Sequence, residues 1–272
     1  MAFRRYLKPR VVPQEVEQIV DALPHHNVGS QGYDPWGLNL DTAKISFTAV
    51  RWLYEHYFRV EAHGLENVPA DGRLLLIGNH SGQLPMDGVM AAYAIATNPH
   101  GPRLPRTMVE RWFPTVPFLG NFINQVGGVV GDPKNCGKML EREEAIIVFP
   151  EGIRGSGKPY RLRYQLQRFG HGFMHLAMEH RTPIVPMGIV GCEETMPSVT
   201  NIKPLARMLG VPYFPLAPLV PLPAKVHICF GEPMHFPDDA RDEGEVERRV
   251  ERVKDAIRDL IDQGLAKRRG KF

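Results

Sequence analysis

The side chains best suited to chemistry in this sequence follow a short apolar run. Residues 74–78 (Leu-Leu-Leu-Ile-Gly) have the composition of a buried strand, and Asn79 and His80 follow them directly. Asp87 comes later in the same segment. A carboxylate near an imidazole fixes its tautomer and stabilises its protonated form, which is what a general base needs. We therefore predict that His80 and Asp87 form a catalytic pair, although Asp87 also suits the positive end of a following helix.

A second candidate segment, Glu151-Gly152-Ile153-Arg154, follows another apolar run at 145–149. An arginine guanidinium binds phosphate with fixed geometry and keeps its charge at any cellular pH. Gly152 lets the backbone come close to a ligand. A surface ion pair between Glu151 and Arg154 is the alternative interpretation. If the two runs are strands of one parallel sheet, both segments lie at the same edge and build one site.

Basic residues are concentrated after this second segment. Positions 152–178 contain no Asp or Glu, although the net charge of the whole chain is only +3. Such a stretch suits anionic lipid headgroups, phosphorylated substrates or nucleic acid, or it is simply solvated surface. Nucleic-acid binding is not expected, because no recognition motif accompanies the charges. The cations are Arg154, Lys158, Arg161, Arg163 and Arg168.

Other function classes are disfavoured by what the sequence lacks. The three cysteines have no paired spacing and no His-rich cluster accompanies them, so neither disulfides nor a metal site are expected. The glycine-rich residues 127–131 lack the Gly-Lys-Ser/Thr ending of a phosphate loop, and no Gly-x-Ser-x-Gly elbow occurs. We expect no signal peptide, and no window reaches the ~18 apolar residues of a spanning helix. A membrane role is therefore expected to be peripheral.

Apolar runs and amphipathic segments alternate along the chain, which predicts an α/β fold with a mixed, mostly parallel central sheet flanked by helices. We predict an N-terminal helical extension at 1–58 and a catalytic domain at 59–272. Five prolines exclude regular structure at 211–224. The predicted strands are residues 59–64, 74–78, 105–110, 126–130, 145–149, 184–190 and 225–230. The predicted helices are residues 13–22, 41–58, 88–97, 116–125, 133–142, 169–180 and 244–267.

The helix predicted at 41–58 is apolar on more than one side. Asp41 and Thr42 are its expected N-terminal cap. A stripe of apolar residues at three- and four-residue spacing follows one face, while Ile45, Trp52 and Leu53 lie outside that stripe. Two interpretations follow. The helix is buried against the domain, or it inserts partly at a bilayer interface with its aromatic side chains at headgroup depth.

Four ordered segments together resemble the glycerolipid acyltransferase superfamily, that is, the PlsC-type 1-acylglycerol-3-phosphate acyltransferases and their relatives. The first is Asn79-His80, and the second is a loose match within residues 106–131. The third, at 149–154 (Phe-Pro-Glu-Gly-Ile-Arg), is a close match, and the fourth lies at 182–187 (Thr-Pro-Ile-Val-Pro-Met). The resemblance covers about residues 60–232. Residues 33–37 and 191–195 also resemble a bacterial subgroup related to neutral-lipid-forming members.

The resemblance implies transfer of a fatty acyl group from a thioester to a glycerolipid hydroxyl in phospholipid biosynthesis, without a covalent intermediate, metal or cofactor. His80 would be the general base and Asp87 the group that holds its ring. Arg154 would bind the phosphate of the acceptor, and Glu151 would contact a glycerol hydroxyl. Backbone amides near Gly152 would stabilise the developing oxyanion. The donor would be acyl-CoA or acyl carrier protein, and the expected acceptor is 1-acylglycerol-3-phosphate.

The same resemblance implies contact with anionic groups beyond the reacting atoms. Lys158 and Arg161 are expected to meet the phosphates of CoA or a membrane surface. We expect a cytoplasmic protein that is peripheral on the inner face of a membrane. Two alternatives stay open: the acceptor is a neutral mono- or diacylglycerol or another lysophospholipid, or the chain is a non-catalytic lipid-binding module.

The first segment departs from the family pattern in one respect. Family members usually have four residues between His and Asp, whereas six separate His80 from Asp87, and Pro85 stands where the usual Asp would fall. Either the loop bulges so that Asp87 still reaches the imidazole, or another carboxylate orients the ring, or none does. The departure also bears on the acceptor, which is expected to bind beside this loop.

Overall fold

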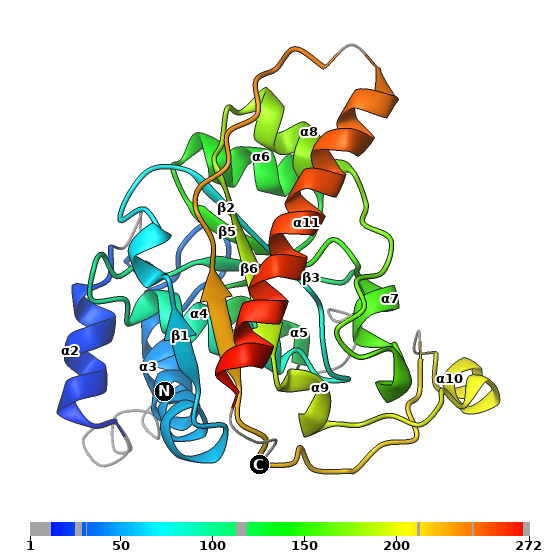
Figure 1. Ribbon diagram of the computed structural model, residues 1–272. Helices are drawn as coiled ribbons and strands as arrows, with labels where there is room; N and C mark the ends of the chain where they lie inside the picture. Colours follow the sequence, from blue (N-terminus) through cyan, green and yellow to red (C-terminus); the bar gives the residue numbers. More distant parts are fainter. Residues whose placement is uncertain are drawn as a thin grey trace.

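The computed structural model describes residues 12–24, 29–30, 32–112, 119–210, 213–240 and 242–268. A seven-stranded sheet runs through it in the order β1-β7-β6-β2-β5-β3-β4, with helices on both faces (Figure 1). All neighbouring strands pair in parallel except β6 and β7. The predicted α/β class with a mixed, mostly parallel sheet is therefore confirmed.

Each strand lies within a segment that was predicted to be one. The parallel core is built from continuous apolar runs, as expected for strands that are covered on both faces. Their bounds are β1 Glu61–His63, β2 Leu74–Gly78, β3 Arg106–Val109, β4 Gly128–Val130, β5 Ala145–Val148, β6 Ile184–Val190 and β7 His227–Phe230.

The main helices also agree with the predicted segments, and helix 41–58 is divided into α3 and a π-helical end. Three short helices, α7, α9 and α10, were not predicted, because one or two turns carry no readable periodicity. The helices are α2 Gln14–Ala22, α3 Leu40–Trp52, the π-helix Leu53–Tyr57, α4 Met86–Ala96, α5 Leu119–Gln125, α6 Pro133–Glu141, α7 Ile153–Ser156, α8 Gly172–Glu179, α9 Cys192–Thr195, α10 Lys203–Leu209 and α11 Glu243–Lys267.

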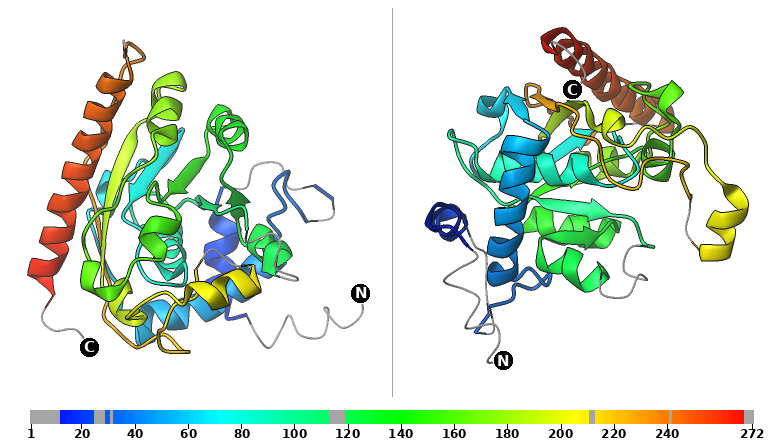
Figure 2. Two further views of the ribbon diagram at one scale, coloured as in Figure 1. Left: turned by 90° about the vertical axis from the view of Figure 1, so that its right-hand side faces the viewer. Right: turned by 90° about the horizontal axis from the view of Figure 1, so that it is seen from below.

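Two apolar clusters cover the two faces of the sheet. Side chains alternate along a strand, so Leu75 and Ile77 of β2 join one cluster and Leu74 and Leu76 join the other. Residues of α6, α8 and α11 complete the first cluster, and residues of α4 complete the second. In Figures 1 and 2 the long helix α11, drawn in orange and red, lies along β6 and β7. These layers hold the strand ends rigidly.

Helix α3 is partly packed and partly exposed, so the burial interpretation holds for one of its faces, and insertion at a bilayer interface stays a prediction. Val50 contacts the second cluster, as do Tyr54 and Tyr57 of the π-helical end. Ile45 and Trp52 are 52% and 53% exposed. The predicted cap was wrong. Asn39 is the N-cap, and its Oδ1 accepts a hydrogen bond of 3.0 Å from the backbone N–H of Thr42. The cap was misplaced because Asn39, Asp41 and Thr42 all have side chains that can cap a helix, and the sequence does not distinguish between them.

Buried ion pairs connect the segment before residue 59 to the sheet. Arg106, at the start of β3, pairs through Nη2 with Asp34 and through Nε with Glu144, at 2.6 Å. Trp36 donates from its ring to Glu144 at 3.2 Å. The division at residue 58 stays a prediction, although these contacts cross it.

Two further expectations concern cysteines and membrane spans. Cys136, Cys192 and Cys229 are buried thiols without a disulfide partner. In the part of the chain that the structure describes, no helix is both long and apolar enough to cross a bilayer.

We expect Gly188→Ala to destabilise the fold. Gly188 lies on β6 under α11, and a Cβ there would lie 2.6 Å from backbone and side-chain atoms of Leu260. Overpacking of this kind costs ~1–3 kcal/mol or more. Gly172→Ala is the matched control, because a Cβ at this position meets nothing within 4 Å. Thermal unfolding of both variants tests this, and an unchanged melting temperature for Gly188→Ala would show that α11 does not pack as described.

Candidate active site

The two candidate segments leave the sheet at the same edge. His80 follows β2 and Glu151 follows β5, and these strands are parallel neighbours. On its other side β2 pairs with β6. Since the carboxyl ends of parallel strands share one edge, the loops after them meet. The structure therefore brings together the two segments that sequence reasoning placed in one site.

The six-residue spacing does not separate the histidine from its carboxylate. Nδ1 of His80 lies 2.6 Å from Oδ2 of Asp87. The loop bulges through Gly82, which has a φ of 80°, and α4 begins at Met86, so Asp87 stands in its first turn. Asp87 is 0% exposed. The expectation that Asp87 reaches the ring across the longer loop thus agrees with this geometry.

The imidazole is held on three sides and presents one nitrogen. His80 stacks on Phe149, with ring centroids 4.7 Å apart and planes 16° from parallel. Its side chain is 12% exposed. A Cβ at Gly155 would lie 2.8 Å from the Cβ of His80, so only glycine allows this approach of α7. Nδ1 faces Asp87, and among the described residues no hydrogen bond reaches Nε2. That nitrogen is the one available to a substrate.

The charges around His80 favour its protonated form. Burial alone lowers the pKa of the imidazole, but the carboxylates of Asp87, Glu151 and Glu110 outweigh burial and raise it above its ordinary value of about 6.5. A ring of this kind is a stronger base than a free histidine. Its neutral form, which accepts a proton, dominates only above the raised pKa.

Glu151 binds the protein's own backbone. One oxygen accepts the N–H of His80 at 2.9 Å, and the other accepts the N–H of Gln167 at 2.7 Å. The residue is 1% exposed. The contact with a glycerol hydroxyl that the resemblance implied does not match this geometry, because the carboxylate is buried and each oxygen already accepts a backbone amide. Glu151 instead fixes the backbone of the histidine.

Asn79 fastens the end of β2 to β6. Its Nδ2 donates to the carbonyl of Ile189 at 2.9 Å, and its Oδ1 accepts the N–H of the same residue at 2.7 Å. Asn79 is 0% exposed. These two hydrogen bonds continue the ladder beyond Gly78, where the main chains separate. Sequence reasoning grouped Asn79 with the histidine but assigned it no role.

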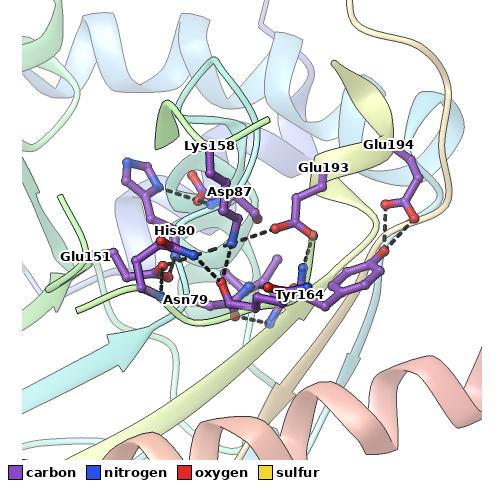
Figure 3. A network of polar contacts seen from close by, with 12 residues as sticks. Asn79, His80, Asp87, Glu151, Lys158, Tyr164, Glu193 and Glu194 are labelled. Carbon is purple, nitrogen blue, oxygen red and sulfur yellow. Dashed lines mark hydrogen bonds and ion pairs between the residues drawn. The ribbon is translucent and has the colours of Figure 1, made fainter. Parts of the chain in front are cut away.

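Lys158 is buried within a polar network that Figure 3 shows beside the histidine. Its side chain is 3% exposed, and Nζ lies 2.7 Å from an oxygen of Glu193. The other oxygen of Glu193 accepts the N–H of Tyr164 at 2.8 Å. Burial raises the pKa of Glu193 to about 7, although Lys158 acts in the opposite direction. The ammonium therefore does not face solvent, where the phosphates of CoA were expected.

Two grooves flank the start of α7. The histidine groove has a volume of about 290 Å³, and His80, Glu110 and Gly152 are among the residues that line it. The arginine groove has a volume of about 590 Å³ and is lined by Arg154 and Arg207, among others. Gly152 adopts a φ of 53°, which suits glycine. Arg154 is exposed, as is Arg161, which lines neither groove.

Glu110 is the groove residue to which sequence reasoning gave no role. It follows β3, which pairs with β5, so its position is equivalent to those of His80 and Glu151. The rule that polar residues after parallel strands gather at one edge identifies it. The strand predicted at 105–110 included Glu110, so Glu110 was not recognised as a polar residue that follows a strand.

One group of possible metal ligands lies elsewhere. Glu61 and His63 of β1 and His227 of β7 place one ligand atom each within 4.8 Å of one another. The ring nitrogens of His63 and His227 are 3.3 Å apart, as in a hydrogen bond, and Lys225 pairs with Glu61. Two strands, β7 and β6, separate β1 from β2. One nitrogen of each histidine and the carboxylate of Glu61 are therefore already engaged, while Nε2 of His227 has no hydrogen-bond partner among the described residues.

We expect Glu151→Gln to lower the free energy of unfolding by ~1–3 kcal/mol. The glutamine side chain has one oxygen and one NH₂ group, so only one of the two backbone N–H groups that Glu151 accepts keeps an acceptor. The other is left as a buried donor without a partner. Glu179→Gln, at an exposed carboxylate on α8, is the control. Urea unfolding measures both. If Glu151 existed only to contact substrate, its replacement would leave stability unchanged.

Comparison with known proteins identifies the family of the chain. A family model described as Acyltransferase matches residues 59–190, a range that contains both candidate segments. An uncharacterised protein of Mycobacterium leprae is 37% identical over 250 residues, covering 88% of this chain and 67% of that protein. One from Mycobacterium tuberculosis is 34% identical over 268 residues, covering 94% and 75%.

More distant relatives have descriptive names. The human "DGAT1/2-independent enzyme synthesizing storage lipids" is 26% identical over 208 residues, which are 75% of this chain and 61% of that protein. The crystal structure of PlsC, the 1-acyl-sn-glycerophosphate acyltransferase of Thermotoga maritima, superposes with a TM-score of 0.56 at 16% identity. It covers 99% of this chain and 96% of that chain, and it shows that the two share a fold. The chain belongs to the acyltransferase family.

Proposed function

We propose that the protein transfers a fatty acyl group from a thioester to the hydroxyl of a glycerolipid, with His80 as general base. One observation carries this proposal. The ring of His80 is fixed through Nδ1 by a buried carboxylate. The same residue lines a groove, and its other ring nitrogen, Nε2, stays available to a substrate. An alcohol is a poor nucleophile at neutral pH, so a positioned base is the group that the reaction needs.

The proposed steps balance without a covalent enzyme intermediate. Nε2 takes the proton of the lipid hydroxyl as its oxygen forms a bond to the thioester carbonyl carbon. Asp87 holds the Nδ1 proton and stabilises the imidazolium. The carbon–sulfur bond then breaks, and the imidazolium returns the proton to the departing thiolate. General-base catalysis of this kind is worth ~10²–10⁴-fold.

The oxyanion of the tetrahedral intermediate needs donors close to the base. The amide of Gly152 already donates to the carbonyl of Phe149 at 3.0 Å, so it is engaged. Ile153 is the first residue of α7, where backbone N–H groups lack intrahelical acceptors. We assign the oxyanion contact to the amide of Ile153. Of the backbone amides near Gly152 that the sequence analysis considered for the oxyanion, this proposal selects the amide of Ile153.

The donor fits the arginine groove. Its lining contains Arg154, Arg207 and Lys158, of which Lys158 is already paired with Glu193. Acyl-CoA carries several phosphates, which guanidinium groups bind well. An acyl carrier protein would present a single phosphate on its prosthetic arm. The two arginines therefore favour acyl-CoA as the donor.

Two acceptor classes follow from the relatives and from the sequence. The Thermotoga enzyme is named for a phosphorylated acceptor, the acceptor also expected from the sequence motifs. The vertebrate relatives are named for storage lipids. Both acceptors present a glycerol hydroxyl to the same base, so the reaction steps do not distinguish them.

We also propose that the protein meets its lipids at a membrane surface through exposed apolar side chains of residues 199–210 and 213–220, the segment that contains α10. Leu219 is 99% exposed, and Val199 is tied to Leu216 by a backbone hydrogen bond of 3.1 Å. In Figure 2 this part of the chain projects from the body. Apolar side chains exposed together are typical of membrane or protein contacts. The surface consists of Val199, Met208, Leu216, Leu219 and Val220.

We expect His80→Ala to abolish acyl transfer and Asp87→Asn to lower kcat more than tenfold. In the wild type, kcat/KM should fall as the pH drops through the raised pKa of His80, above about 6.5, because the protonated ring accepts no proton. Asp87→Asn removes a negative charge that raises this pKa, so the acid limb should move to lower pH. Radiolabelled acyl-CoA and product separation measure both effects.

The control is the melting temperature of His80→Ala, which should stay close to that of the wild type. Undiminished turnover in this folded variant would refute the base assignment. Vesicle binding by the wild type without any thioester cleavage would instead identify a non-catalytic lipid-binding module.

We expect the double variant Leu219→Ser, Val220→Ser to bind neutral lipid vesicles more weakly. Both side chains are largely solvent-exposed, so their loss should not change stability. Leu265→Ser, at a 37% exposed leucine on α11, is the control. Co-flotation with vesicles gives the answer, and equal binding by all three proteins would exclude this surface as the contact.

A further inference from the structure

The two grooves at the start of α7 differ in charge. The lining of the arginine groove includes Arg154 and Arg207 and no carboxylate. The histidine groove includes Glu110 and Arg111 beside His80. The side chain of Arg111 is 74% exposed, and its Nη2 lies 3.0 Å from Oδ2 of Asp132, so it pairs with a carboxylate at the solvent side of the groove. Of the two charged residues beside His80, Glu110 is the one whose charge acts on the imidazole.

Glu110 stands close to the reacting centre. A Cβ at Gly152 would lie 2.8 Å from Oε1 of Glu110, so this oxygen lies against the start of α7. Its charge also acts on the ring of His80. Within the described residues Glu110 has no hydrogen bond or ion pair that would neutralise it. Residues 113–118, outside that part, contain no ionisable side chain.

The remaining lining of the histidine groove suits lipid rather than a charged head. Met108 and Val109 of β3, Val148 of β5, and Phe149 contribute apolar surface. A phosphate monoester carries about two negative charges near neutral pH. Placed here it would meet Glu110, with Asp87 behind the imidazole, in a partly desolvated groove where like charges repel strongly.

We propose that the acceptor is an uncharged acylglycerol, a mono- or diacylglycerol, and that Glu110 is the residue that selects against phosphorylated acceptors. This inference rests on the proposed function. It replaces the acceptor expected from the sequence motifs, and it assigns Arg154 to the phosphates of the donor. The carboxylate of Glu110 also offers an acceptor for a second glycerol hydroxyl.

Separate assays with three acceptors test the proposal. The purified full chain receives saturating oleoyl-CoA and either monooleoylglycerol, dioleoylglycerol or 1-oleoylglycerol-3-phosphate in uncharged detergent micelles. The pH is set above the acid limb of every variant, so protonation of His80 does not contribute. The wild type should have a higher kcat/KM for the neutral acceptors. In Glu110→Gln the ratio of phosphorylated to neutral kcat/KM should rise by about tenfold, because the repelling charge is gone.

Two variants serve as controls. Glu179→Gln removes an exposed carboxylate on α8, away from both grooves, and should leave the ratio unchanged. Arg154→Ala should raise the KM for oleoyl-CoA and also leave the ratio unchanged. If Arg154 instead bound the phosphate of the acceptor, this variant would lower the ratio, which would overturn the proposal.

Ionic strength provides a second measurement, and its first part uses the wild type alone. Salt screens repulsion between charges in contact with solvent, so added salt should raise the ratio in the wild type but not in Glu110→Gln. A wild type that prefers 1-oleoylglycerol-3-phosphate would overturn the acceptor assignment, as would an unchanged ratio in Glu110→Gln. Absence of transfer to every acceptor would overturn the proposed function as well, so the two failures are distinguishable.

Discussion

The buried carboxylate of Asp87 is the constraint on which the histidine loop depends. A charge removed from water costs several kcal/mol unless hydrogen bonds compensate it. Oδ2 accepts from the His80 ring and, at 2.8 Å, from the amide of Ser81, while Oδ1 accepts from the amide of Gly88 at 2.8 Å. The first turn of α4 adds a favourable dipole. The loop is thus held in the one arrangement that satisfies this charge.

The same centre concentrates negative charge in a chain whose net charge is +3. Asp87, Glu151 and Glu110 all act on one imidazole, and each does so differently. Asp87 orients the ring, Glu151 fixes its backbone and Glu110 faces the groove. The basicity of the ring and the proposed repulsion of anionic acceptors therefore have a common origin.

Most of the fold could be predicted from the sequence. Continuous apolar runs such as 74–78 and 184–190 marked buried strands, and amphipathic spacing marked α11. Short elements such as α7 and α10 could not be predicted, since a helix of one or two turns depends on tertiary contacts rather than on its own pattern. The cap at Asn39 was misplaced for a similar reason, because Asp41 and Thr42 have equivalent capping chemistry and only the chain path selects between them.

The sequence by itself determined which residues end the strands and which of them have reactive side chains, because residue type and apolar pattern are local properties. It therefore identified His80 and Asp87 as a pair and marked Glu151 and Arg154 as parts of the same region. Only the tertiary structure decided what each side chain faces. In the folded chain Glu151 is buried and accepts two backbone amides, and Arg154 lines a different groove from His80. The sequence could not show this, because strand order and loop packing are set by contacts between distant segments.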